Sequence, residues 1–106
     1  MFGTVTRLKP KQGHIQHLID MNTEWQEGHG ATVEGFVGEY LFESERNPGE
    51  YLLVVLFDDR ESYRANAADP EQDKWYRQMR QHLTEDPIWE DGEIIHAHST
   101  GMMPPM

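Results

Sequence analysis

The sequence predicts an α+β fold in which strands and helices follow one another as β-α-β-β-α-β around a single antiparallel sheet. Three observations support this prediction: an apolar strand at residues 51–57, a turn at residues 47–50 before it, and a helical pattern on each side of this hairpin. A length of 106 residues suits one domain with its own core. We therefore expect a single domain over residues 1–99 and a flexible tail over residues 100–106.

The first half of the chain alternates strand, helix and strand. Residues 2–8 alternate in polarity, which is typical of a strand. Apolar side chains then recur every three or four positions, so a helix is expected at about residues 10–28. Residues 33–45 alternate again, and Gly35 and Gly38 within them indicate a bulge or a close backbone approach.

The centre of the sheet is predicted at residues 51–57, where the side chains of both alternating faces are apolar. Such a strand is typical of the middle of a sheet that is covered on both sides. Pro48 and Gly49 stand just before it and favour a type II turn, because proline presets φ and glycine tolerates a positive φ. The turn predicts an antiparallel hairpin with the strand that precedes it.

Two helical segments follow the hairpin. Residues 58–61 carry a capping signal for a short helix that runs to about Ala67. Asp69 and Pro70 repeat the signal for a longer helix, which is expected to end near Pro87 because a residue before proline disfavours the helical conformation.

The chain is predicted to finish with a turn at residues 90–93 and a strand at residues 94–99. The complete order is that of the ferredoxin-like fold, whose antiparallel sheet has the strand order 4-1-3-2. This order puts the third strand, residues 51–57, in a central position that fits its two apolar faces.

The composition excludes several classes of function. With 19 acidic and 9 basic side chains the formal charge is -10, which argues against a nucleic-acid partner. The absence of cysteine excludes disulfides, thiolate metal sites and cysteine nucleophiles. No apolar run approaches the roughly 18 residues that span a bilayer, and the N-terminus does not read as a signal peptide. We expect a cytoplasmic protein that binds neither nucleic acid nor membrane.

Three local stretches carry a resemblance to a known family: residues 34–40, 53–59 and 68–76. Together with the order and length of the elements over residues 2–99, they resemble the antibiotic biosynthesis monooxygenases (ABM-type domains) of the dimeric α+β barrel superfamily. The resemblance implies a homodimer in which two sheets pack face to face, with a small-molecule pocket between sheet and helices in each subunit. It also implies a monooxygenase that needs no cofactor and acts on an aromatic, quinol-type or polyketide-like molecule, because the substrate anion itself reduces dioxygen.

The apolar second face of the sheet supports the homodimer independently of the resemblance. Helices on one side of the sheet cover only one face of residues 51–57, and the other face is equally apolar. A small chain that exposed this face would carry a large apolar patch, which normally marks an interface.

The candidate site residues are centred on the second long helix. Trp75, Met79 and His82 lie within about 40° of one another around a helix. The aromatic rings supply apolar contact area, and an imidazole supplies a base near neutral pH. The expected catalytic residues are His82, Asn66 and Tyr63, and the expected substrate-binding residues are Trp75, Met79, Trp25 and Tyr40.

The same residues also fit plainer roles, which leave other functions open. A stripe of Trp75 and Met79 at helical spacing is typical of a core, and Asn66 can cap local backbone. One alternative function is a non-catalytic dimeric binding protein for an apolar small molecule or haem. Another is a small isomerase or decyclising enzyme, because this superfamily uses one pocket for several chemistries. Haem degradation in a related branch uses an Asn on the first strand, where this chain has Thr4 and Thr6.

Two pairs of histidines are candidate metal ligands. His96 and His98 lie on one face of the predicted last strand, about 6.5–7 Å apart. His14 and His17 are one helical turn apart. In neither pair does the spacing fix a third ligand. We therefore predict no metal and no other cofactor.

Overall fold

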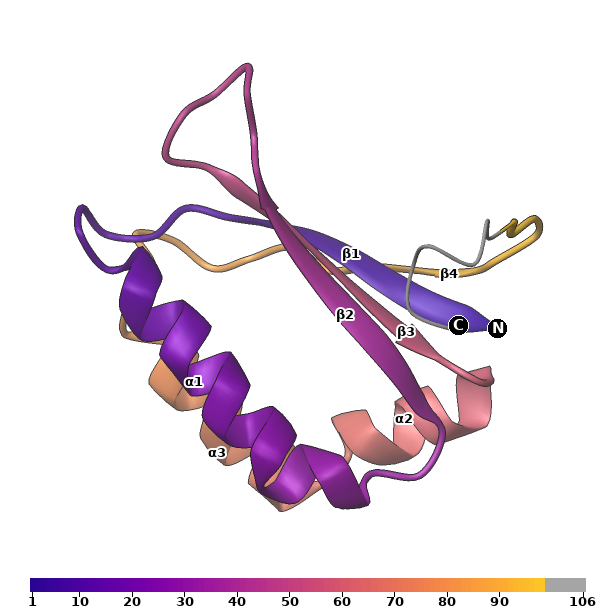
Figure 1. Ribbon diagram of the computed structural model, residues 1–106. Coiled ribbons are helices and arrows are strands. Elements are labelled where there is room, and N and C mark those ends of the chain that lie inside the picture. The colour runs from indigo at the N-terminus through magenta and orange to yellow at the C-terminus, as the bar shows by residue number, and fades with distance from the viewer. Residues whose placement is uncertain (99–106) are drawn as a thin grey trace.

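The computed structural model describes residues 1–98, which form one four-stranded sheet with its helices gathered on one side. The elements are β1 (Phe2–Leu8), α1 (Ile15–Glu27), the 3₁₀ helix η1 (His29–Thr32), β2 (Phe36–Glu43), β3 (Tyr51–Phe57), α2 (Arg60–Ala67), α3 (Pro70–Arg80) and β4 (Glu90–Glu93). All strand pairs are antiparallel, and the strand order is β2-β3-β1-β4. This is the predicted ferredoxin-like fold, with the predicted order read from the opposite edge (Figure 1). The predicted tail, residues 100–106, lies outside the described residues.

The central position predicted for β3 is confirmed. It pairs along its whole length with β1 on one side and with β2 on the other. Leu53 and Phe57 are buried on the face that the helices cover. Leu52 and Val54 alternate with them on the uncovered face and stay partly exposed. The two apolar faces of this strand therefore meet different surroundings.

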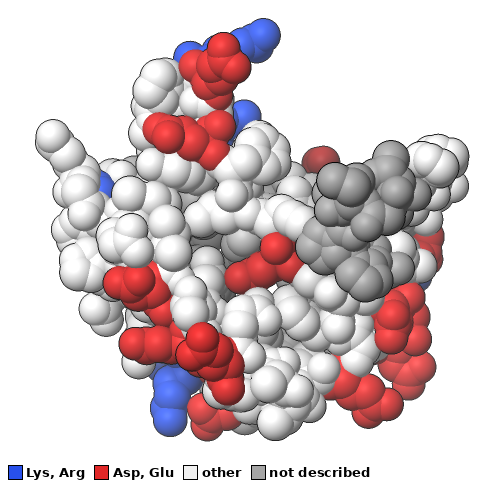
Figure 2. Space-filling model, viewed as in Figure 1, with Lys and Arg blue, Asp and Glu red and all other residues white. Residues whose placement is uncertain are grey.

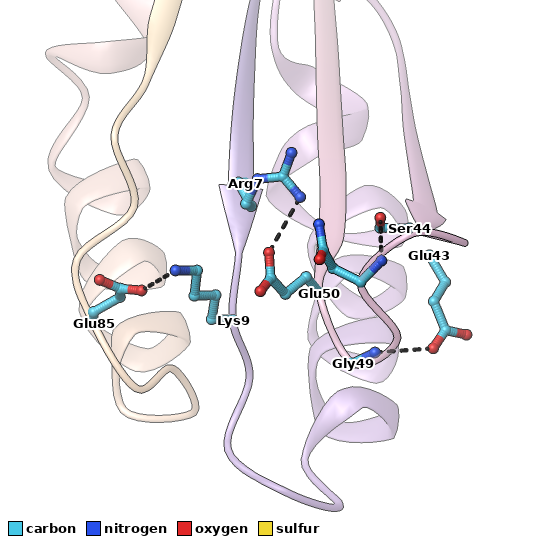
Figure 3. A network of polar contacts seen from close by, with 8 residues as sticks. Arg7, Lys9, Glu43, Ser44, Gly49, Glu50 and Glu85 are labelled. Carbon is cyan, nitrogen blue, oxygen red and sulfur yellow. Dashed lines mark hydrogen bonds and ion pairs between the residues drawn. The ribbon is translucent and has the colours of Figure 1, made fainter.

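The turn between β2 and β3 is the predicted type II turn. Gly49 has a φ of 89°, and the Glu50 N–H donates to the Asn47 carbonyl at 3.0 Å. The Gly49 N–H also donates to the Glu43 carboxylate at 3.2 Å, and Arg7 forms an ion pair with Glu50 at 3.2 Å (Figure 3). The two hydrogen bonds thus close the turn of the hairpin, and the ion pair links it to β1.

The predicted irregularity in β2 is a bulge. The register between β2 and β3 shifts between Phe36 and Gly38. Because of this extra residue, Phe36 and Glu39 lie on the same face of the sheet, opposite Phe57 and Val55. That face is the one covered by the helices, so the bulge directs a carboxylate toward the interior.

The core joins the sheet to α1 and α3. Its buried residues are Leu8, Leu18, Leu53, Met79 and Leu83. The first helix begins at Ile15 and not near residue 10, where the sequence predicted its start. The reason is that Pro10 forms a β-bridge with Leu83 and the Lys11 N–H donates to the His82 carbonyl at 2.8 Å, which holds this stretch extended.

The prediction that the last helix continues to near Pro87 is wrong. α3 ends at Arg80, so His82 lies beyond its end. The Thr84 N–H donates to the Lys9 carbonyl at 2.8 Å, and Lys9 forms an ion pair with Glu85 at 2.7 Å (Figure 3). These contacts with the segment after β1 draw the chain out of the helix.

The position of the last strand is also corrected. Residues 90–93, predicted as a turn, form β4, whereas residues 94–98 lie outside any strand and residue 99 is not described. β4 pairs with β1 through register partners such as Thr4 and Asp91. An edge strand is held by backbone hydrogen bonds and faces solvent, so it needs no apolar side chains. No helix within residues 1–98 is long and apolar enough to cross a membrane.

Candidate active site

A cavity of about 370 Å³ lies between the sheet and the helices. Its size falls within the range of about 300–1,000 Å³ that is usual for small-molecule sites. The aromatic side chains of its wall come from both layers and are Trp25, Phe36, Phe57, Tyr63, Trp75, Tyr76 and Trp89. The polar side chains of its wall are Thr4, Glu39, Asn66, Gln72 and Asp73. Figure 2 shows the surface hollowed between the strand and helix layers, with acidic side chains in the hollow.

Tryptophan rings form one wall of the cavity. Trp25 lies seven positions after Leu18, on the stripe of α1 that faces the sheet. Its ring centre is 6.2 Å from that of Trp75 and 5.9 Å from that of Phe36. Gly30 in η1 is buried against the same ring, where a β-carbon would collide with it. The glycine therefore permits the close approach that holds Trp25 in the wall.

Several polar atoms of this wall are buried without a hydrogen-bond partner among residues 1–98. They are the indole nitrogens of Trp25 and Trp75 and the side-chain oxygen of Asn66. A buried polar group without a partner costs about 1–3 kcal/mol. A ligand that met these atoms with matching oxygens and N–H or O–H groups, after a small shift of the side chains that cover them, would remove this cost. The cavity is thus chemically suited to a flat molecule with polar atoms on its edge.

Glu39 brings an ionisable group to the cavity. It lies on the helix-facing side of β2 and is only partly exposed. Burial raises the pKa of its carboxyl group, and the neighbouring Gln26 amide opposes this shift. No ion pair involving Glu39 is formed within the described part of the chain. Glu39 was not among the residues expected at the site, although a glutamate between Val37 and Leu41 on one face of the predicted strand was the available signal.

Tyr63 and Asn66 both lie on α2 and reach the cavity. They are three positions apart and so share one face of the helix. The Tyr63 hydroxyl donates to the Asp91 carboxylate at 2.8 Å, and burial, together with this contact, raises its pKa. The ring of Tyr63 packs against Phe2 and Phe57.

Comparison with known proteins identifies the family. The model of the ABM family, antibiotic biosynthesis monooxygenase, matches residues 1–78. The chain belongs to this family. None of the curated proteins matches it.

Solved structures with the same fold include members of the ABM family. One is a mutant of SnoaB, a cofactor-independent oxygenase from Streptomyces nogalater, with 14% identity and a TM-score of 0.75 over 91% of this chain and 94% of that chain. Another, from Caulobacter crescentus, has 15% identity and a TM-score of 0.76 over 90% of each chain. A third, from Deinococcus radiodurans, has 17% identity and a TM-score of 0.74 over 93% of this chain and 97% of that chain. At such identities these likenesses establish the fold alone.

In this ABM protein, the cavity brings together four of the seven residues expected at the site. Trp25, Trp75, Tyr63 and Asn66 line it. Their proposed roles in binding and catalysis stay predictions.

The other three expected residues lie elsewhere. Met79 is 1% exposed and belongs to the core cluster. Tyr40 is the register partner of Val54 and so lies on the uncovered face of the sheet. His82 is absent from the cavity wall because the helix ends before it.

His82 instead belongs to a group of three imidazoles. Its Nδ1 atom is 3.1 Å from that of His14, and its ring centre is 5.3 Å from that of His17. Desolvation lowers the pKa of His82, and the nearby His14, His17 and Lys11 lower it further. Within residues 1–98 no group of three histidine or acidic side chains is arranged to hold a metal ion.

A second, more open hollow of about 530 Å³ lies beside α2. Its wall is acidic, with Glu34, Asp58 and Asp59 among its residues. His29 pairs there with Asp69 at 2.8 Å, and the pKa of Asp69 is lowered by the Glu71 N–H that its carboxylate accepts and by this histidine. We place the candidate site in the inner cavity because that wall holds the aromatic rings and the unpaired polar atoms.

Proposed function

We propose that this ABM protein is a cofactor-independent monooxygenase that oxidises an aromatic, quinol-type or polyketide-like small molecule inside the cavity. The observation that carries the proposal is a largely aromatic cavity whose wall holds unpaired hydrogen-bonding atoms. Membership of the family and the likeness in fold to a cofactor-independent oxygenase support it.

The proposed chemistry balances with dioxygen as the only co-reactant. For a ring methylene, R₂CH₂ and O₂ give R₂C=O and H₂O, so the substrate supplies all four electrons. The protein then has to bind the molecule, remove a proton and exclude water. Trp25 and Trp75 are proposed to hold the substrate through ring contacts and indole N–H donors.

Asn66 and Tyr63 are proposed to stabilise charge that develops on the substrate. Both face the cavity from α2. A positioned donor for a developing oxyanion is worth on the order of 10²–10³ in rate. The Tyr63 hydroxyl already donates to Asp91, so the proposed donor is the side-chain NH₂ group of Asn66, whose oxygen atom can only accept.

Oxygen uptake with a panel of hydroquinones and anthrones tests this function. We expect uptake with at least one compound and a substantial loss in Trp75→Phe, which keeps a ring but removes the indole N–H. Tyr40→Phe is the matched control, because Tyr40 lies on the other face of the sheet. No uptake with any compound would reject the oxygenase. Haemin binding in a parallel spectral titration would then favour the alternative, a non-catalytic binding protein for an apolar molecule or haem.

We also propose that two copies of the chain pack through the uncovered face of the sheet. Phe42 is 50% exposed and Val5 is 43% exposed on that face, with Tyr40 and Val54 beside them. Exposed apolar patches of this kind mark interfaces.

Light scattering during size-exclusion chromatography tests the dimer. Wild-type protein is expected at twice the monomer mass, and Phe42→Glu as a monomer. Ile19→Glu is the matched control, since Ile19 is an exposed apolar residue of α1 in the helix layer. A monomeric wild type at micromolar concentration would reject the proposal.

A further inference from the structure

We infer that Glu39 takes the reacting proton from the substrate, and that the cavity therefore favours molecules that enter without a negative charge. The inference rests on the proposed function and deepens it. It adds a catalytic base, a role for which the sequence suggested His82, and a charge preference for the substrate.

The first argument is the position of Glu39. The bulge in β2 turns this residue toward the helices, opposite Val55. Glu39 and Phe36 line the inner cavity and also an outer groove between α1 and β2. Glu39 thus stands where the cavity meets a route to solvent, so it can receive a proton inside and release it outside.

The second argument compares Glu39 with the other ionisable groups of the cavity wall. The Tyr63 hydroxyl is engaged with Asp91 at 2.8 Å, and its raised pKa keeps it protonated. Asp73 pairs with Arg77 at 3.0 Å, and its side chain is 57% exposed. Neither is arranged to accept a proton from a buried ligand. Glu39 is the carboxylate of this wall that no cation engages.

The third argument is the environment of the carboxylate. Burial raises the pKa of Glu39, and only the Gln26 amide opposes the shift. A carboxylate that has lost part of its hydration is a stronger base than one in water, yet it is ionised once the pH exceeds its pKa.

The proton transfer is a simple two-bond exchange. A C–H or O–H bond of the substrate breaks, an O–H bond forms on the Glu39 carboxylate, and the electron pair stays on the substrate. Delocalisation carries this charge to the conjugated carbonyl oxygen, and the proposed donors to it are the indole N–H groups of Trp25 and Trp75, which lack a partner in the protein. The substrate oxygen then faces the helices while its acidic group faces β2.

The charge of the site favours a neutral substrate. The chain has a formal charge of -10, and Glu39 itself is an anion in its active form. A molecule that is already a carboxylate would meet like charges in a poorly hydrated place, which is costly. A neutral carbon acid or phenol enters without that penalty and becomes an anion only as Glu39 becomes neutral.

Anaerobic hydrogen exchange of anthrone tests the inference separately from oxidation. Anthrone is a neutral tricyclic ketone with an acidified methylene group, and NMR in D₂O follows the loss of its methylene protons. We expect the wild type to catalyse exchange with a rate that rises with pH to a plateau. In Glu39→Gln the rate should fall about 100-fold and the inflection should disappear, since a general base contributes on the order of 10²–10⁴.

Two further variants complete the experiment. Glu39→Asp keeps the carboxylate and should retain part of the rate together with the pH inflection. Glu43→Gln is the matched control: it makes the same substitution in the same strand, at the exposed turn end, and should exchange at the wild-type rate. Quenching of tryptophan fluorescence by anthrone, measured for each protein, checks that binding is intact.

The outcomes separate the inference from the proposed function. If Glu39→Gln binds anthrone and exchanges its protons as fast as the wild type, Glu39 is not the base, even where oxygen uptake supports the oxygenase. If the wild type binds anthrone without accelerating exchange, the inference also fails. If the wild type does not bind anthrone, the aromatic cavity is not a site for such ketones, and both the substrate class and the base are rejected.

Discussion

Replacement of Met79 by alanine distinguishes a core residue from a substrate-binding one. Met79 is 1% exposed, packs in the cluster with Leu18, Leu53 and Leu83, and is not one of the residues that line the cavity. The change removes three heavy atoms from a close-packed place. Truncations of this kind cost about 2–5 kcal/mol, because the lost contacts add to the cost of the void left behind.

For a domain of this size, 1 kcal/mol corresponds to a shift of about 4–8 °C in Tm. A cost of about 2 kcal/mol, the lower end of the range, therefore predicts a Tm that falls by about 8–16 °C. Urea denaturation at one fixed protein concentration should give the same free-energy difference. Met79→Leu, which conserves volume, should lose less than about 1.5 kcal/mol.

The decisive measurement is ligand binding below the lowered Tm. Folded Met79→Ala should bind anthrone at the same concentrations as the wild type, as followed by fluorescence quenching, whereas Trp75→Phe should bind it more weakly. A stable Met79→Ala protein with impaired binding would mean that Met79 faces the ligand, and the separation of core and cavity drawn above would be wrong.

Three other perturbations have defined outcomes. Acidification should destabilise the protein, because desolvation and the 3.1 Å contact with His14 lower the pKa of His82 in the folded state. The unfolded state therefore binds more protons than the folded state. The contribution of His82 to stability is complete above its usual pKa of about 6.5 and is lost as the pH falls through the lower, folded-state pKa. Urea midpoints between pH 8 and 5 measure this, and His82→Asn should flatten the curve. Gly35→Ala should cost at least about 1–2 kcal/mol, because Gly35 has a φ of 81° and a β-carbon there would lie 2.5 Å from the Ser62 side chain; a Tm equal to that of wild type would contradict this. Glu39→Gln should stabilise the protein at pH 8 and have little effect at pH 4, because a raised folded-state pKa makes ionisation unfavourable to folding only at the higher pH; a lower urea midpoint at pH 8 would refute it.

The parts of the fold that followed from the sequence are those where local chemistry and packing demand the same structure. The two apolar faces of residues 51–57 require a central strand, and Pro48 with Gly49 requires a tight turn before it. Asp69 and Pro70 likewise fix the start of α3. Each of these signals is contained within a few neighbouring residues.

The parts that did not follow depend on partners far away in the chain. β4 is made of Glu, Asp and Gly, and only its backbone pairing with β1 makes it a strand. The end of α3 depends on hydrogen bonds to Lys9 and Lys11, and it decides that His82 turns away from the cavity. The sequence contains no local trace of either contact.

The position of the cavity follows from small residues on the covered face of the sheet. Thr4 and Thr6 stand where larger apolar side chains would otherwise meet the helices, and their hydroxyls donate to the carbonyls of Glu90 and Ile88 at 3.2 and 2.9 Å. The small Thr4 side chain therefore leaves space above the sheet, and its hydroxyl is already hydrogen-bonded. The free hydrogen-bonding capacity remains with the helix side chains on one wall and with Glu39 on the strand at the other. A bound molecule must form hydrogen bonds with both the helix wall and Glu39. These two walls, rather than the floor, therefore determine which edge of a substrate faces the base.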